Sequence, residues 1–291
     1  MANADLDAAK LGRAIGRRER RHQVFDADTA ARMAALLDWE TPPPAGGDLP
    51  PLWHWSYFTP LTRAGDLARD GHAVKGAFLP DVPLPHRLFA GARIRFHAPI
   101  RIGDAVERHS TVHDVRVKEG RTGPLVFVVV HHELSVGGQV ALQEEQDIVY
   151  RGAAPEPASG ALPGEALPRV QFSREVAPDP VLLFRYSAVT FNGHRIHYDR
   201  DYAVGQEGYP GLVVQAPLTA TLLADLLRMH RPDARLTSAQ FRALRPICDT
   251  APFTICGHCA GDTAILWAQA PAGGVALRLD GQLKVAGRVK A

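Results

Sequence analysis

The stretch LVVQAPLTATLLADLLRM, residues 212–229, is the one strongly apolar run with helical character in this chain. Its apolar residues cover all sides of the predicted helix, so we expect this helix to be buried. The helix is entered at Pro217, because proline suits the first turn of a helix. We therefore expect free backbone N–H groups near Pro217 that can stabilise a negative charge.

Segments rich in Val, Ile and Phe, typical of β-strands, follow this helix and also fill much of the first half of the chain. The later set covers residues 238–246, 252–259, 264–269 and 275–285. The earlier set covers residues 92–98, 104–117, 124–135 and 139–150. Glycines at positions 120, 123, 137 and 138 interrupt the earlier set and indicate hairpin turns, as in an antiparallel meander.

The first half of the chain also contains a predicted helix. Residues 28–39, DTAARMAALLDW, begin with capping residues and keep apolar side chains at helical spacing. A Pro-rich loop at 41–51 follows them. The segment FHAPI at 96–100 is echoed by ALRPI at 243–247, about half a chain later, which favours a duplicated unit.

Residues 151–168 are dominated by Ala, Pro, Gly and Glu without periodicity, which is typical of a linker. We therefore predict an N-terminal repeat at 1–150, a linker at 151–168 and a C-terminal repeat at 169–291. Each repeat is expected to be a long helix wrapped by an antiparallel β-sheet. The predicted fold class is α+β, and the architecture is a double hot dog.

The composition is that of a soluble globular protein. The chain has 291 residues, of which 46% are hydrophobic and 22% charged, and its formal net charge is +2. The Arg-rich run at 13–21 is too local for nucleic-acid binding, which needs a broad basic surface. No apolar run approaches the roughly 20 residues that span a bilayer. Three cysteines confined to 248–259 suit a reducing compartment, so we expect a cytoplasmic protein.

A second informative stretch is FRYSAVTFNGHRIHYD at residues 184–199. It gathers Asn192, His194 and His197 in one short segment, close in sequence to the predicted start of the long helix. Imidazole and amide groups beside free helix N–H groups suit proton transfer and the stabilisation of an anion. A purely structural role of the two histidines is the alternative interpretation.

These residues resemble those of a known enzyme family. Residues 190–197, TFNGHRIH, resemble the hydratase motif of the MaoC-like hydratases and dehydratases, which include (R)-specific enoyl-thioester hydratases. Residues 184–199 look closer to the mesaconyl-C4-CoA and itaconyl-CoA hydratases and to the mitochondrial-type 3-hydroxyacyl-thioester dehydratases. Similar segments occur along most of the chain, at 49–55, 76–80, 83–85, 90–91, 96–97, 103–104 and 241–246.

The resemblance implies reversible addition of water to the α,β double bond of an acyl thioester, carried by CoA or an acyl carrier protein, without a metal or organic cofactor. In the wider family an aspartate, and a histidine five residues later, hold the water and carry its protons. The matching positions here are Asn192 and His197. An asparagine does not accept a proton near pH 7, although its amide can orient water. We therefore expect His197 to be the base, since an unperturbed imidazole titrates at roughly 6.5, with His194 as second candidate.

The start of the long helix is the expected site of charge stabilisation. Addition of water to the β-carbon moves negative charge onto the thioester oxygen, where one good N–H donor contributes on the order of 3 kcal/mol. The candidate donor is the backbone N–H of Ala216, which matches the family's glycine in the turn before Pro217. Gln215 stands where the family more usually has a histidine.

A zinc centre is a competing interpretation of the same histidines. His194 and His197, together with Cys256 and Cys259, offer suitable ligand types. However, two residues three apart in a strand point to opposite faces, which favours packing roles for the cysteines. We expect no metal.

Three functional hypotheses follow. The leading one is a hydratase of a short, branched dicarboxylic acyl-CoA, such as mesaconyl-C4-CoA or itaconyl-CoA. The second is a 3-hydroxyacyl-ACP dehydratase of fatty-acid synthesis, and the third is a catalytically silent hot-dog protein that binds acyl thioesters. We expect one active site per chain, in the second repeat, no nucleic-acid or membrane partner, and a homodimer that covers the edges of the sheet.

Overall fold

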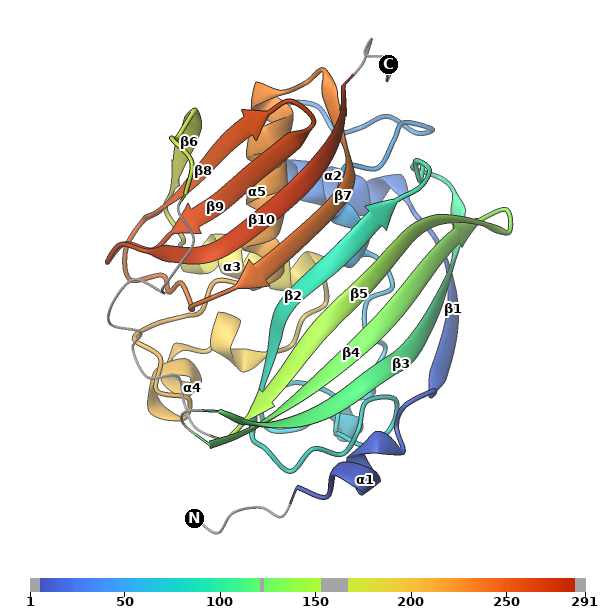
Figure 1. Ribbon diagram of the computed structural model, residues 1–291, viewed down its shortest axis with the longest axis vertical. Helices are drawn as coiled ribbons and strands as arrows, with labels where there is room; N and C mark the ends of the chain where they lie inside the picture. The colour runs from blue at the N-terminus through green and yellow to red at the C-terminus, as the bar shows by residue number, and fades with distance from the viewer. Residues whose placement is uncertain (1–5, 121–122, 153–166, 286–291) are drawn as a thin grey trace.

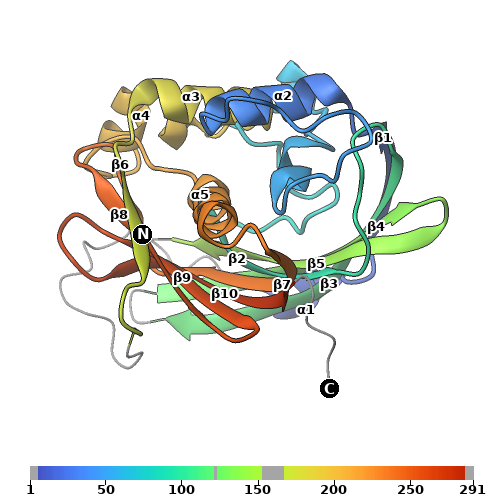
Figure 2. The same ribbon diagram turned by 90° about the horizontal axis from the view of Figure 1, so that it is seen from above.

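A curved antiparallel sheet wraps around helix α5 (Ala216–His230), and further helices close the other side (Figures 1 and 2). The structure is a computed structural model that describes residues 6–120, 123–152 and 167–285. Within these residues the sheet has ten strands. Figure 2 shows three layers, with the sheet at the bottom, α5 in its hollow, and α2 (Ala27–Leu36) beside α3 (Pro180–Val189) on top.

The strand order is β1-β3-β4-β5-β2-β7-β10-β9-β8-β6. Read outward from the central pair of β2 and β7, the order β2-β5-β4-β3-β1 corresponds to the order β7-β10-β9-β8-β6. The first half consists of β1 (Arg18–Val24), β2 (His86–Phe96), β3 (Ala105–Gly120), β4 (Gly123–Val136) and β5 (Gln139–Arg151). The second half consists of β6 (Phe172–Val176), β7 (Ala234–Ala243), β8 (Phe253–Ala260), β9 (Thr263–Gln269) and β10 (Val275–Val285). The two halves join where β2 pairs with β7, from Gly91 opposite Arg242 to Arg95 opposite Ser238.

This architecture confirms the predicted α+β hot-dog fold, and the eight strands expected from sequence are all present. The mirrored order of the strands supports the division into repeats at 1–150 and 169–291, which stays a prediction. Most of the expected linker, residues 153–166, lies outside the described residues.

Helix α5 is buried as expected. It begins at Ala216, one residue before the expected entry at Pro217. The residues before it are extended and bonded to neighbouring segments; Val213 N–H donates to Ile196 O and Val214 N–H to Ile247 O. Every residue from 218 to 227 is buried. The one buried charge in this run, Asp225, accepts from Trp39 Nε1 at 2.8 Å and from the Arg228 guanidinium, so its burial is compensated.

The expectation of a long wrapped helix in both repeats was wrong for the first repeat. Helix α2 exists, but it packs against α3 in the outer layer. Between α2 and β2 the described chain forms only two short 3-10 helices, η1 (Trp53–Ser56) and η2 (Ala64–Asp66), and the buried side chain of Trp53 fills core space there. The physical reason is the density of proline at 42–51, since proline lacks the N–H that a helix interior requires.

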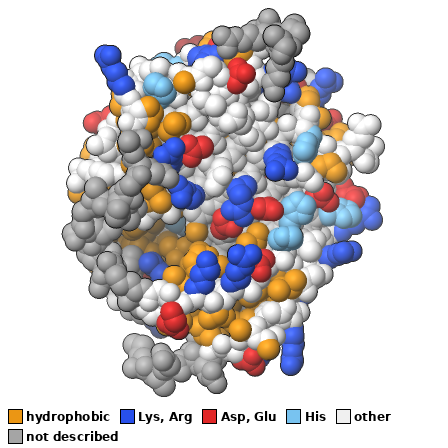
Figure 3. Space-filling view, in the orientation of Figure 1, with side chains coloured by type: hydrophobic (Ala, Val, Ile, Leu, Met, Phe, Trp, Pro, Cys, Tyr) orange, Lys and Arg blue, Asp and Glu red, His pale blue; other side chains and the backbone are white. Residues whose placement is uncertain are grey.

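Two edge strands, β1 and β6, were not predicted. Strand β1, RERRHQV, alternates between exposed and half-buried residues, so it has no apolar face to recognise. Charged residues are common on edge strands because they discourage pairing with another sheet. The face of the sheet turned away from α5 also carries charges of both signs (Figure 3), including the ion pairs of Arg93 with Glu145 and Asp147.

Three short helices complete the fold: α1 (Ala8–Gly12), η3 (Arg195–His197) and α4 (Arg200–Gly205). Asp199 caps α4 by accepting from Tyr202 N–H at 3.0 Å. Among the described residues, no helix is long and apolar enough to cross a lipid bilayer.

A buried polar cluster ties η1 to the sheet of the first repeat. The Glu144 carboxylate lies 3.1 Å from His54 Nε2 and accepts from Trp55 Nε1 at 2.9 Å. Burial would raise the pKa of Glu144, but His54 and then His132 lower it to about 2. Glu144 therefore stays ionised in the folded protein and is well provided with donors.

We predict that Glu144→Ala lowers the free energy of unfolding by about 3–5 kcal/mol, because it leaves buried donors of His54 and Trp55 without an acceptor. Urea denaturation at pH 7 measures the change. The exposed Glu40 provides the matched control, and Glu40→Ala should stay within about 0.5 kcal/mol of the parent. Equal effects of the two substitutions would contradict a stabilising role for the cluster.

Candidate active site

A cavity of about 1160 Å³ lies between the two repeats. Residues of β2 and β5 from the first repeat form part of its wall, together with segments of the second repeat. The sequence-predicted residues Asn192, His194, His197 and Ala216 all line this cavity. The structure thus brings the whole predicted set to one place.

His197 is held at the end of η3 by a hydrogen bond from its ring. The Nδ1 atom lies 2.7 Å from Val213 O, and the side chain is buried apart from a small exposed part. Because a carbonyl oxygen only accepts, Nδ1 carries the proton, and Nε2 keeps a lone pair. Val213 is fixed in turn by its N–H bond to Ile196 O and its bridge to Cys248. The segment that leads into α5 therefore sets the tautomer of His197.

The surroundings keep His197 neutral. Burial lowers the pKa of His197 to about 3, and the neighbouring His194, whose ring centroid lies 5.4 Å away, acts in the same direction. A neutral imidazole keeps the Nε2 lone pair that a general base requires.

Asn192 has a local structural bond that leaves part of its amide available. Its Oδ1 accepts from His194 N–H at 3.1 Å, and its backbone N–H donates to Ser187 O. The preceding Phe191 has a left-handed backbone, with φ of 50°, which turns the chain out of α3. The side-chain oxygen is used by this turn, so the Nδ2 group is the part of Asn192 that can reach a ligand.

His194 is buried and lies beside a carboxylate that the sequence pattern did not reveal. Its Nε2 is 3.6 Å from Glu207 Oε1, and Glu207 Oε2 lies 3.0 Å from His86 Nδ1. Burial would raise the pKa of Glu207, but His194 and His86 lower it to about 2. Glu207 is therefore an anion behind the cavity wall.

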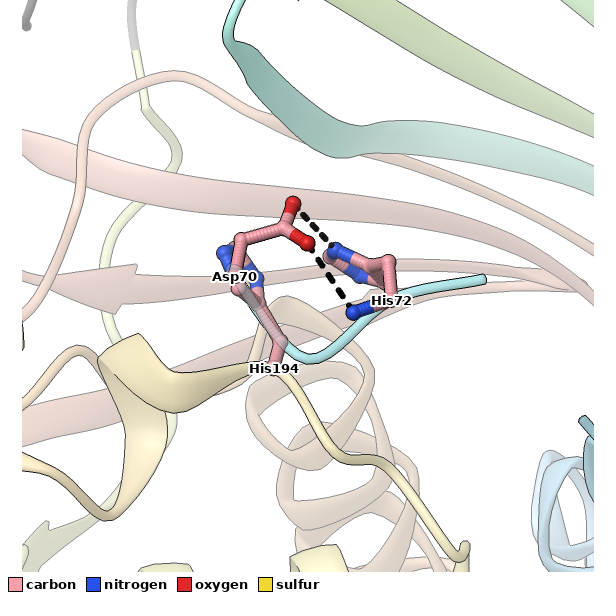
Figure 4. A group of neighbouring side chains, drawn as sticks. All are labelled: Asp70, His72 and His194. Atoms are coloured by element: carbon pink, nitrogen blue, oxygen red, sulfur yellow. Dashed lines mark hydrogen bonds and ion pairs between the residues drawn. The ribbon is translucent and has the colours of Figure 1, made fainter. Parts of the chain in front are cut away.

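Asp70 and His72 were also not predicted, and they come from the loop after η2 in the first repeat. Figure 4 shows both carboxylate oxygens of Asp70 directed at His72; Oδ1 accepts from its backbone N–H and Oδ2 lies beside its ring, each at 3.0 Å. His72 lines the cavity, and its ring centroid is 4.1 Å from that of His194. Burial, and then the charge of Arg87, lowers the pKa of His72 to about 3.

Asp70, His72 and His194 are also of metal-ligating types, and one potential ligand atom of each lies within 4.8 Å of the others. Both Asp70 oxygens already face donors of His72, so the arrangement is that of a carboxylate–imidazole pair rather than of an open ligand set. Within the described part of the chain this is the one such group, and Cys256 and Cys259 of β8 do not join the histidines.

The start of α5 opens on the same cavity. Ala216 is its first residue, and the backbone there is not left-handed, so a side chain is accommodated. Gln215, almost completely buried, donates through Nε2 to Leu183 O and to Ser187 Oγ at 3.0 Å each. These bonds fix the first turn of α5 against α3, and they hold the Ala216 N–H at the cavity wall.

Solved structures share this fold. A MaoC-like dehydratase from Phytophthora capsici has a TM-score of 0.68 at 12% identity and covers 97% of this chain and 100% of its own. HtdX from Mycobacterium tuberculosis has a TM-score of 0.64 at 18% identity and covers 91% of this chain and 99% of its own. The chain thus has the hot-dog architecture of the MaoC-like dehydratases.

Sequence comparison identifies the family. The model of the hydroxyacyl-thioester dehydratase type 2 family matches residues 52–249. A mesaconyl-C(4)-CoA hydratase from Chloroflexus aurantiacus is 47% identical over an alignment of 270 residues, and the match covers 90% of this chain and 94% of that protein. The mitochondrial hydroxyacyl-thioester dehydratase type 2 of Schizosaccharomyces pombe is 25% identical over an alignment of 244 residues, and the match covers 75% of this chain and 80% of that protein.

This protein belongs to the hydroxyacyl-thioester dehydratase type 2 family. It is a hydro-lyase that adds water to, or removes water from, an acyl thioester. The predicted resemblance is confirmed.

We predict that His197→Ala lowers kcat about 10²- to 10⁴-fold, the range expected for loss of a general base. Steady-state kinetics on an enoyl thioester, with circular dichroism to verify folding, measures the effect. His22 on β1 is largely exposed, and His22→Ala serves as the matched control with unchanged kcat. A fully active His197→Ala enzyme would exclude His197 as the base.

A second prediction concerns the protonation of His197. Because its pKa is lowered to about 3, the ring stays neutral, and its Cε1–H resonance should not shift between pH 8 and 5. NMR titration, with the resonance assigned by its loss in His197→Gln, provides the measurement. A midpoint near the ordinary histidine value of roughly 6.5 would show that burial does not control this group.

Proposed function

We propose that this protein catalyses the reversible hydration of a short, branched dicarboxylic enoyl-CoA, such as mesaconyl-C4-CoA or itaconyl-CoA. The observation that carries the proposal is the meeting of a neutral His197, the Asn192 amide and the start of α5 at one cavity. The 47% identity to a mesaconyl-C(4)-CoA hydratase supports this choice of substrate.

In the hydration direction, His197 Nε2 removes a proton from water while the Nδ2 group of Asn192 orients the water oxygen. The oxygen forms a bond to the β-carbon, and the electron pair of the double bond moves through the α-carbon to the thioester oxygen. The Ala216 N–H stabilises the resulting enolate at the helix start. His197 then returns the proton to the α-carbon, so that the enzyme regains its starting state.

Arg87 supports a substrate with a second carboxylate. It lies on β2 opposite Tyr150 of β5, is half-buried and lines the cavity. It is near His72, and the positive charge of Arg87 lowers the pKa of His72. Among the described residues, no Asp or Glu forms an ion pair with Arg87. A half-buried guanidinium without an internal counter-ion suits a carboxylate ligand, which it can bind through two hydrogen bonds.

The size of the cavity favours a second candidate, a dehydratase of longer 3-hydroxyacyl chains on an acyl carrier protein. About 1160 Å³ exceeds the volume of a short acyl group, and apolar residues such as Phe89 and Ile148 line part of the wall. Parallel assays with CoA and carrier-protein thioesters of the same acyl group distinguish the two carriers. A silent thioester-binding protein would bind both and convert neither.

We predict that Arg87→Met lowers kcat/KM for mesaconyl-C4-CoA about 10- to 100-fold, since a hydrogen bond to a charged group contributes about 1.5–3 kcal/mol. The rate with crotonyl-CoA, which has no free carboxylate, should change less than about threefold. Arg32 on α2 is exposed, and Arg32→Met is the matched control. An equal loss on both substrates would remove the support for a dicarboxylic acyl group.

The homodimer and the cytoplasmic location stay predictions. Three apolar side chains within α3 or just after it are more than half exposed: Val181, Phe184 and Phe191. A second copy would shield such residues from water. Light scattering of the purified protein measures the oligomeric state.

A further inference from the structure

We infer that His72, oriented by Asp70, is a second catalytic imidazole, which holds the attacking water together with His197. This inference deepens the proposed function, because it concerns the same hydration at the same cavity. It gives the first repeat a direct part in the reaction, beyond shaping the wall. It also answers what compensates for the asparagine at position 192.

The loop that carries His72 is a tight turn with its own bonds. Ala68 N–H donates to His72 O at 2.7 Å, Gly71 N–H donates to Ala68 O at 2.9 Å, and Leu67 bridges to Ala73. The Asp70 side chain accepts from His72 N–H, which closes the turn from inside. A loop of this kind holds its side chains in fixed positions.

The same loop is docked onto the motif of the second repeat. Arg195 N–H donates to Asp70 O at 2.9 Å, and the Arg195 guanidinium donates to Arg69 O at 3.2 Å. Gly71 has a φ of +89°, and a Cβ atom built on it would lie 1.8 Å from Gly193 O. Only glycine permits this approach, so the loop is fitted to the segment that carries Asn192, His194 and His197.

Asp70 sets the tautomer of His72. An ionised carboxylate only accepts, so the Nδ1 atom at 3.0 Å carries the proton, and Nε2 keeps its lone pair. Burial would raise the pKa of Asp70, but the hydrogen bonds donated by His72 hold it well below its usual value. His72 and His197 therefore share one state: each has a protonated Nδ1 bound to an oxygen and an Nε2 that can accept.

The His194 ring contacts both of the other rings, with centroid distances of 4.1 Å to His72 and 5.4 Å to His197. In the proposed arrangement one water lies between the Nε2 atoms of His72 and His197. His72 is close enough to contribute to the lowered pKa of His197, and both residues line the cavity. The water donates one hydrogen to each Nε2, which leaves an oxygen lone pair to attack the β-carbon.

The proton balance of this step is simple. The water proton that is hydrogen-bonded to His197 Nε2 moves to that nitrogen, and the water oxygen forms the new bond to the β-carbon. The other hydrogen stays on the oxygen and remains bonded to His72. The α-carbon later receives the proton from His197, so water is the only co-reactant consumed. Asp70 is a positioning residue, because it acts only through His72.

The decisive variant is Asp70→Asn, whose amide N–H can donate to Nδ1 and so favour the tautomer with the proton on Nε2. We expect kcat to fall about 10²-fold or more, with KM changed less than about threefold, because the lost acceptor contacts water rather than the acyl group. His72→Gln, which keeps an acceptor, should retain more activity than His72→Leu. Asp66→Asn, exposed at the end of η2, is the matched control and should match wild type.

Nitrogen-15 NMR of the wild-type protein keeps the inference testable even where a variant fails to fold. We expect the Nδ1–H tautomer of His72 in wild type and the Nε2–H tautomer in Asp70→Asn. The inference is overturned by an Nε2–H tautomer in wild type, or by a folded Asp70→Asn with normal kcat. All kinetics use the enoyl thioester that wild type hydrates fastest. If the wild-type protein hydrates no enoyl thioester, the proposed function is contradicted. This outcome is distinct from the results that overturn the role of His72.

Discussion

A helix that is apolar on every side is stable in water only when its sides are enclosed, and the rest of this fold encloses α5 from residue 218 to residue 227. The sheet curves around it, and α2 and α3 close the open side (Figure 2). The one end of α5 that opens on the cavity is its N-terminus, where Gln215 fixes the first turn against α3. Burial of the helix therefore directs its free N–H groups at the cavity.

The two halves of the fold differ in their helices. Both contribute five strands, but only the second has the wrapped helix. In the first repeat a proline-rich segment and two short 3-10 helices take its place. The chain between α2 and β2 is thereby free to extend across to the second repeat and to present Asp70 and His72 beside His194. The first half thus has a polar segment at the cavity where the second half has its buried helix.

The sequence predicted those features that depend on local patterns. Helix α5 and eight strands follow from apolar runs and turn glycines, whereas edge strand β1 escaped because its charged residues leave no apolar face. Asn192, His194, His197 and Ala216, which all line the cavity, were proposed from sequence because they lie within or near one recognisable motif. Asp70, Glu207 and Arg87 were not assigned, because their positions depend on contacts across the fold. For Asp70, the only local signal in the sequence was its place two residues before a histidine. That pattern fits an Asx turn, but it is common in sequences.

The most direct test of the central claim is to incubate the protein with mesaconyl-C4-CoA in oxygen-18 water and to analyse the product by mass spectrometry. Water addition at the double bond predicts an intact thioester that carries one heavy oxygen on the β-carbon. Recovery of unchanged thioester, or of a free acid with the heavy oxygen in its new carboxylate, would contradict hydration at this cavity.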